Sequence, residues 1–295
     1  MAPYEPRTAM SDKPNTLLSE GSAAWRLLAA AARTARMVVF CGIPGVGKSF
    51  LLREQLRLAL AAGRRVSLLQ WDVSRQAFEI PAILHRYPEL QGSTHVMIRR
   101  AVGIWLRDAI VQWSDAHSGP AHLLLIEAPL VGGRMSELAY QADDRAEPLL
   151  SGRDVHFYVP TPTRDVRLAI EAARRAETAS HRHARDAANA APALVDELWQ
   201  MVAQTAARLS IRVAEPLSGY SPEAYFAVYR AVLRHRRVTE VPVEEIVSAA
   251  GSPHALDKSV DELVPASVDV AALIARAEAE GDEPVAARAA RWYET

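Results

Sequence analysis

Eight consecutive residues of this chain have the types and the spacing that bind a nucleotide phosphate. They match the pattern G-x-x-x-x-G-K-[ST] at every fixed position. In such a loop, successive backbone N–H groups surround the phosphate oxygens, the lysine reaches the β- and γ-phosphates, and the final hydroxyl group helps to hold Mg²⁺. Lys48 supplies this lysine, and Lys13 and Lys258 are the only others in the chain. The eight residues are Gly42, Ile43, Pro44, Gly45, Val46, Gly47, Lys48 and Ser49.

The residues on either side of this loop favour a nucleotide site. Residues 37–41 are all apolar and predict a short buried strand, and the apolar spacing of residues 49–62 predicts a helix that ends before Gly63. A strand, a glycine loop and a helix N-terminus together direct backbone N–H groups and the positive end of the helix at an anion. The alternative is a glycine-rich turn that only links a strand to a helix.

A carboxylate follows the second predicted strand. Residues 65–71 predict this strand, and Asp72 comes directly after it. Phosphoryl transfer needs a group that orients the acceptor hydroxyl and takes its proton, and Asp72 is the candidate for that role. Arg75 is the candidate for binding a phosphate or carboxylate of the acceptor. The alternatives are an aspartate that caps the next turn and an ordinary exposed arginine.

The strongest strand prediction in the chain also ends in a carboxylate. Residues 122–126 form the apolar run, and Glu127 follows them. A carboxylate at this position of a phosphate-loop protein usually helps to hold Mg²⁺, so we expect Glu127 and Ser49 to be metal ligands. The alternative is a polar strand end that faces solvent.

Residues 128–134 follow this strand and contain two glycines. We expect them to form a flexible loop at the same edge of the sheet, where it could close over an acceptor. Arg134, at the end of the loop, is therefore a second candidate for binding the acceptor.

An arginine-rich helical stretch begins at about residue 164. Its arginines could hold triphosphate oxygens in pairs when a lid closes, and we assign Arg164 and Arg167 to catalysis. The alternative is an exposed, ion-paired helix, because Glu171 lies four residues from both Arg167 and Arg175. The four arginines of the stretch are Arg164, Arg167, Arg174 and Arg175.

Strands that alternate with helices are what must position these residues. The alternation predicts parallel βαβ units, and ligands bind such sheets at the carboxyl ends of the strands. We therefore predict an α/β, three-layer P-loop NTPase fold with a mostly parallel, five-stranded sheet and a C-terminal helical extension. The predicted parts are a flexible N-terminus (1–15), a core (16–219) with a lid at about 160–190, and the extension (220–295). The predicted strands are residues 37–41, 65–71, 122–126, 154–159 and 209–213.

The composition is that of an ordinary soluble globular protein. Hydrophobic residues make up 49% of the chain and charged residues 23%, and the net charge is −1. This charge predicts no general attraction to nucleic acid or to an acidic membrane, and no apolar run is long enough to span one. Cys41 is the only cysteine, so we expect a buried thiol and a cytoplasmic protein without disulfides.

Together these motifs resemble the P-loop kinases of the nucleotide-kinase group, and among them the zeta-toxin type. The resemblance covers roughly residues 36–215. It implies that Asp72 acts as the base on an acceptor hydroxyl and that arginines of the lid contact ATP phosphates. Zeta-type kinases phosphorylate a nucleotide sugar, and related kinases act on nucleosides, nucleotides, antibiotics or sugars. The matching segments are Gly42–Ser49, Asp72–Arg75, Arg86–Pro88, Leu125–Pro129, Phe157–Pro160 and Arg164–Arg175.

The expected function is an ATP- and Mg²⁺-dependent kinase that transfers the γ-phosphate to a hydroxyl or a phosphate of a small molecule. The alternative is an ATPase or a nucleotide-binding switch without a small-molecule acceptor. A typical motor ATPase carries Asp-Glu at the end of the strand that holds Glu127, whereas Ile126 precedes Glu127 here. The sequence therefore favours the kinase.

Overall fold

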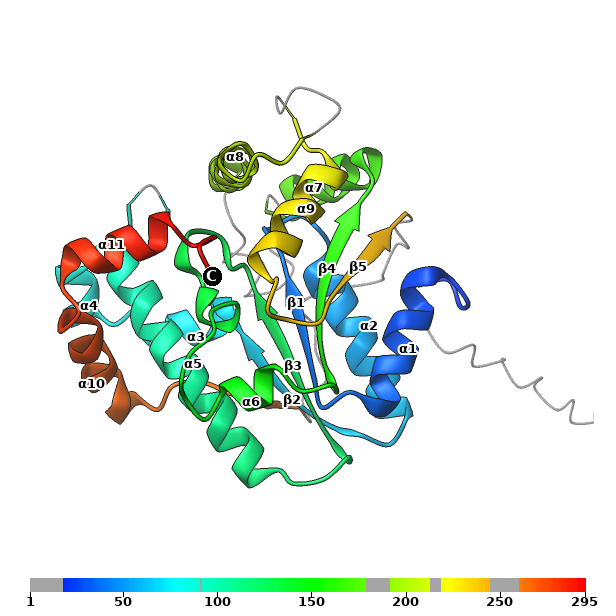
Figure 1. Ribbon diagram of the computed structural model, residues 1–295, viewed down its shortest axis with the longest axis horizontal. Coiled ribbons are helices and arrows are strands. Elements are labelled where there is room, and N and C mark those ends of the chain that lie inside the picture. Colours follow the sequence, from blue (N-terminus) through cyan, green and yellow to red (C-terminus); the bar gives the residue numbers. More distant parts are fainter. Residues whose placement is uncertain (1–17, 91, 179–191, 213–218, 245–259) are drawn as a thin grey trace, which may run out of the picture.

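The computed structural model describes residues 18–90, 92–178, 192–212, 219–244 and 260–295. These residues form three layers, with a parallel sheet between two layers of helices (Figure 1). The sheet has six strands in the order β5-β4-β1-β3-β2-β6, and each neighbouring pair is parallel. The predicted α/β class is confirmed. The strands are β1 (Met37–Cys41), β2 (Arg65–Gln70), β3 (His122–Ala128), β4 (Val155–Pro162), β5 (Val238–Val243) and β6 (Asp261–Glu262).

The central strands are apolar because helices cover both of their faces. Every residue of β1 is buried, and in β3 a buried run of leucines follows His122. Such continuous apolar runs are typical of parallel strands in the middle of a three-layer fold. Helix α1 (Ala23–Thr34) leads into β1, and it starts where the Ser22 hydroxyl accepts a hydrogen bond from the backbone N–H of Trp25 at 3.2 Å.

The two faces of the sheet carry separate hydrophobic cores. On one face, α1 and α2 (Lys48–Ala61) pack against alternate residues of the strands, such as Val38 and Leu125. On the other face, α5 (Val96–Ala116) and α9 (Pro222–Val232) pack against residues such as Val39 and Ile126. Helices α10 (Ser267–Glu278) and α11 (Asp282–Ala290) then cover α5 on its outer side (Figure 1).

Shorter helices connect these elements. The segment after β2 forms α3 and α4, and the long connection between β3 and β4 contains two 3₁₀ turns, η1 and η2, and then α6. Two further helices, α7 and α8, follow β4. Their bounds are α3 (Trp71–Gln76), α4 (Pro81–Arg86), η1 (Val131–Gly133), η2 (Ser136–Leu138), α6 (Glu147–Leu150), α7 (Arg164–Thr178) and α8 (Pro192–Arg208).

The predicted sheet of five strands is wrong in two respects. Residues 209–212 form no strand, because the backbone N–H groups of Leu209 and Ile211 donate to carbonyls of α8 and thereby complete the end of that helix. Ser210 takes a left-handed backbone conformation there, as is common just after a helix. The fifth and sixth strands instead come from the predicted C-terminal extension, which is therefore not only helical.

Some predictions lie outside the described residues. These are the flexible N-terminus (1–15), the end of the strand predicted for 209–213, and the part of the lid at 179–191. In the part of the chain that is described, no helix combines the length and apolar character that a membrane crossing requires.

Candidate active site at the carboxyl edge of the sheet

The glycine loop lies between β1 and α2, as the sequence predicts. Gly47, directly before α2, has a φ of 89°, a left-handed conformation that glycine adopts at no steric cost. No side chain caps the start of α2, so the first N–H groups of the helix remain directed at the loop. A nucleotide phosphate is the kind of anion that such a helix N-terminus binds.

Lys48 lies inside this loop and not on its surface. Its side chain is 5% exposed, and its Nζ atom donates a hydrogen bond to the carbonyl of Ile43 at 3.0 Å. The same Nζ lies 3.5 Å from Oε1 of Glu127. The lysine and the glutamate, 79 positions apart in the sequence, therefore come together as predicted.

Glu127 faces the loop from the neighbouring strand. The register places it beside Phe40 of β1 and Gln70 of β2, and the Gln70 side chain donates a hydrogen bond to its Oε2 at 3.1 Å. Its side chain is only 12% exposed, and β3 continues to Ala128. Glu127 is therefore not a solvent-facing strand end.

The oxygen atoms at this point suit a hard cation. The Ser49 hydroxyl lies 3.5 Å from both carboxylate oxygens of Glu127. That is longer than the usual O–H···O hydrogen bond of about 2.7 Å, so the two groups face each other without a strong bond between them. Carboxylate and hydroxyl oxygens are ligands that Mg²⁺ prefers, and Ser49 and Glu127 are the residues that would hold it.

Helix α7 covers the glycine loop. A Cβ atom placed on Gly47 would lie 3.9 Å from the Ile170 side chain. Arg167, one turn before Ile170, is 5% exposed, and its guanidinium lies 4.4 Å from the centre of the Tyr220 ring. Its Nε atom donates to Glu171 at 2.8 Å, whereas Nη1 has no hydrogen-bond partner among the described residues. Arg167 thus forms the predicted ion pair, but it is buried and keeps a donor for another ligand.

The other arginines of the lid are placed differently. Arg164 is exposed, and its Nε atom donates to the backbone carbonyl of Tyr220 at 3.0 Å. The backbones of Arg174 and Arg175 belong to α7, but their side chains lie outside the described part.

Asp72 and Arg75 lie together on α3, directly after β2. The Asp72 side chain is 58% exposed and accepts a hydrogen bond from Arg75 Nε at 3.2 Å. Arg75 also contacts Glu79, and it lies 3.8 Å from Glu89. Asp72 is therefore accessible to an acceptor, whereas Arg75 already has three carboxylates around it.

The loop after β3 is not the exposed, closing segment that the sequence suggested. Residues 128–139 are all buried, and a Cβ atom on Gly133 would lie 3.2 Å from Ala289 of α11. Arg134 is therefore also buried, with 4% of its surface exposed. The segment is packed under helices because it fills the space between the sheet edge and α5, α8 and α11.

Two further residues, neither of them predicted from the sequence, meet Arg134. Nη2 of Arg134 and Nη2 of Arg99 each donate to the Ser93 hydroxyl at 2.6 Å. Arg99 lies in the first turn of α5, where acidic residues are favoured and arginine is not. This unusual position was the one signal in the sequence that could have identified it.

Cys41 is fully buried at the end of β1, as predicted. Burial raises the pKa of its thiol, so Cys41 acts as a small apolar residue next to the glycine loop.

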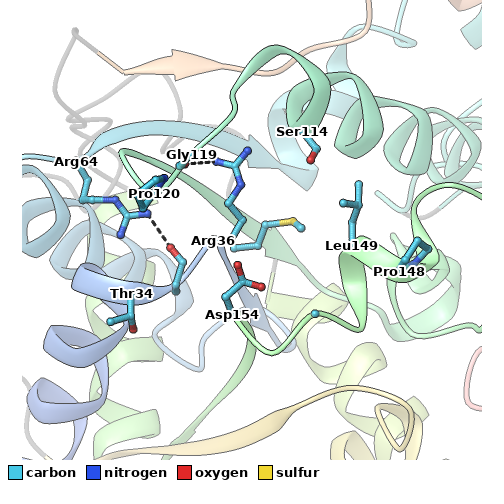
Figure 2. Close-up of a pocket in the computed structure, with 12 residues that line it drawn as sticks. Thr34, Arg36, Arg64, Ser114, Gly119, Pro120, Pro148, Leu149 and Asp154 are labelled. Carbon is cyan, nitrogen blue, oxygen red and sulfur yellow. Dashed lines mark hydrogen bonds between the residues drawn. The ribbon is translucent and has the colours of Figure 1, made fainter.

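A pocket of about 380 Å³ lies at the opposite, amino-terminal edge of the sheet (Figure 2). Arg36 and Arg64 line it, and both donate to backbone carbonyls, including that of His122 at 3.2 and 2.8 Å. Arg36 also lies 4.1 Å from the centre of the Trp113 ring. These contacts hold α1, the loop after α5 and β3 together, so we assign the arginines of this pocket a structural role.

No protein-family model, no curated protein and no solved structure matches this chain. The described residues also contain no group of three or more His, Cys, Asp and Glu side chains that could hold a metal ion without other ligands. The functional conclusion therefore depends on the geometry of the carboxyl edge.

Proposed function

We propose that this protein is an ATP- and Mg²⁺-dependent P-loop kinase that transfers the γ-phosphate to a hydroxyl or phosphate oxygen of a small molecule. The observation that carries the proposal is the meeting of Lys48, Ser49 and Glu127 at the ends of β1 and β3. The strand order around β1 and the glycine loop at its carboxyl end support a fold of the P-loop type.

Each of these residues has a role that its surroundings support. The backbone N–H groups of the loop and the Lys48 ammonium would bind the phosphates. Ser49 and Glu127 would hold Mg²⁺, which, when bound, neutralises charge on the phosphate oxygens. Arg167 would donate its Nη1 N–H groups to the transferred phosphoryl group from α7, with the exposed Arg164 on the same helix.

Asp72 is the residue that would activate the acceptor. The acceptor oxygen forms a bond to the γ-phosphorus while the bond to the β-phosphate oxygen breaks, so ADP leaves. The proton of the acceptor hydroxyl passes to the Asp72 carboxylate. The exposure of Asp72 at the end of β2 leaves it accessible for this role.

Acceptor-dependent release of ADP tests the proposal. The protein is incubated with ATP, Mg²⁺ and a panel of nucleotides, nucleotide sugars, sugars and other metabolites. We expect turnover with at least one acceptor, loss of ATP binding in Lys48→Ala, and loss of turnover by a factor of about 100 or more with retained ATP binding in Asp72→Asn.

A matched control is Asp269→Asn, which removes the same charge from the first turn of α10, outside the site. It should behave as the wild-type protein does. ATP hydrolysis that no acceptor stimulates would instead favour an ATPase, and unchanged ATP affinity in Lys48→Ala would count against both functions.

A further inference from the structure

Two arginine side chains converge on one serine beside the proposed active site. The Ser93 hydroxyl accepts a hydrogen bond from Arg99 and another from Arg134, both at 2.6 Å. Two donors at one small oxygen atom bring the two guanidinium groups close together. Ser93 and Arg134 are 6% and 4% exposed and Arg99 is partly buried, so water reaches the charge of Arg134 poorly.

No carboxylate is in direct contact with this cluster to balance its charge. In the described residues, no carboxylate lies within 4.0 Å of Arg99 or Arg134. Burial lowers the pKa of Arg134 to about 9, and the charge of Arg99 contributes to the shift, whereas the charges of Glu197 and Asp72 oppose it. Burial also lowers the pKa of Arg99 to about 10, against the charge of Glu197. Both groups remain cationic at neutral pH, and a buried cation with no counter-charge in direct contact is costly.

A purely structural role explains only part of this arrangement. Arg99 donates to the carbonyls of Thr94 and Gly132 at 2.6 and 2.9 Å, and Arg134 donates to that of Val131 at 3.1 Å. These bonds fix the loop after β3. A guanidinium has five N–H donors, and Arg134 uses two hydrogen bonds within the described part of the chain. The remaining donors, and the excess positive charge, fit an anion.

The cluster lies on the acceptor side of the site. Asp72 and Arg75 are near enough for their charges to affect the pKa of Arg134. The N-terminus of α5, a helix of 21 residues, adds its positive end at Val96. The loop also contains Leu130 and Met135 with φ of 63°, a conformation that costs free energy and is concentrated at functional sites.

We propose that Arg99, Arg134 and Ser93 bind an oxyanion group of the acceptor, either a phosphate or a carboxylate. The phosphate acceptor is then an anionic metabolite, held at its charged group by this cluster while Asp72 activates its hydroxyl. This substrate class rests on the proposed kinase function, but binding of the anion itself does not.

Inorganic phosphate and malonate are the two probes, and they distinguish a phosphate from a dicarboxylate. Each is titrated calorimetrically into protein saturated with Mg²⁺ and a non-hydrolysable ATP analogue, so that the glycine loop is filled. We expect binding of at least one probe, weakened about tenfold or more in Arg99→Gln and in Arg134→Gln, because each variant loses a charge-assisted hydrogen bond. Arg276→Gln, an exposed arginine on α10, is the charge-matched control and should bind as the wild-type protein does.

Two results would overturn the inference: no binding of either probe, or equal affinity in wild-type protein and Arg99→Gln. Circular dichroism checks the fold, and Arg99→Gln alone decides the matter where Arg134→Gln does not fold. Titration of phosphate into Lys48→Ala without nucleotide tests the anion site separately from the proposed kinase function. Phosphate binding that persists there and depends on Arg99 supports the anion site even if no ATP-dependent transfer is found.

Discussion

Two pairs of buried or partly buried arginines in this molecule differ in the group that each pair shares. Arg107 and Arg236 share the carboxylate of Glu147, at 3.1 and 2.6 Å, and Arg107 also lies 2.6 Å from Asp144. We call them the carboxylate-linked arginines. Arg99 and Arg134 share the neutral hydroxyl of Ser93, and we call them the serine-linked arginines.

The difference separates a structural role from a binding role. In the first pair, two guanidinium groups meet two carboxylates, so the charges are balanced and the donors are used. Arg236 also donates to the carbonyl of Leu138 at 2.7 Å, which fixes the chain between β3 and β4. The second pair also consists of arginines that hold the chain between β3 and β4. Among the described residues, however, no carboxylate is in contact with either of them. Arginines whose charge carboxylates balance stabilise the fold, whereas arginines with excess positive charge are available to bind an anionic ligand.

Breaking the carboxylate-linked pair should give the largest loss of stability. We expect Arg236→Ala to lower the free energy of unfolding by about 3–5 kcal/mol, because it leaves Glu147 without its closest partner and the carbonyl of Leu138 without its side-chain donor. Urea unfolding measures the effect. Arg234→Ala, an exposed arginine two residues away, should change stability by less than about 0.5 kcal/mol. Equal effects in the two variants would show that the buried network adds no stability.

Neutralising Glu147 should have a smaller effect that depends on pH. Burial alone would raise the pKa of Glu147, but hydrogen bonds from Arg236 and Arg107 outweigh burial and lower it. A carboxylate whose pKa is lower in the folded state stabilises the fold above its unfolded pKa of about 4.3, and this contribution is lost as the pH falls through the folded pKa. We therefore expect Glu147→Gln to cost about 2–3 kcal/mol at pH 7 and less below about pH 4. Urea unfolding at pH 7 and pH 3 measures this difference, and a cost that does not change with pH would contradict the assignment.

Gly103 lies on α5 between the two pairs, four residues after Arg99 and four before Arg107. A Cβ atom there would lie 2.1 Å from the carboxyl carbon of Glu137, which Arg100 holds at 2.8 Å. We expect Gly103→Ala to lower the free energy of unfolding by about 1–2 kcal/mol, because the buried Glu137 must move. Gly219→Ala, where a Cβ meets no atom within 4 Å, is the control. An unchanged unfolding free energy in Gly103→Ala would mean that Glu137 has another position available.

The part of the candidate site that could be predicted from the sequence is the part defined by spacing along the chain. The glycine loop, the strand before it and the helix after it are contiguous, so their pattern specifies the backbone and predicts a phosphate ligand. Asp72 and Glu127 were predicted to lie at the candidate site because they follow apolar runs that predict parallel strands. The carboxyl ends of such strands meet at one edge whatever their separation in the chain.

The other part could not be predicted in this way. Ser93, Arg99 and Arg134 meet because the loop after β3 folds under α5, and no periodic pattern encodes that contact. Strand β5 was missed because it contains Glu240 and Pro242, which are unfavourable in strands and are tolerated at the edge of a sheet. Residues 209–212 were mistaken for a strand because an apolar alternation can also end a helix.

Replacing a serine-linked arginine should give the smallest change in stability, in clear contrast to the replacement of a carboxylate-linked arginine. In Arg134→Met a buried cation is replaced by an apolar side chain of similar length, so the lost hydrogen bonds to Ser93 and Val131 are offset by relief from Arg99. We expect the free energy of unfolding in anion-free buffer to change by less than about 1 kcal/mol. Inorganic phosphate should then stabilise the wild-type protein more than the variant, because a ligand that binds only the folded state raises its stability. Thermal unfolding with and without phosphate measures both effects, with Mg²⁺ and a non-hydrolysable ATP analogue present throughout. A loss of about 3 kcal/mol or more without phosphate, as expected for Arg236→Ala, would place Arg134 with the structural arginines and remove the distinction between the two pairs.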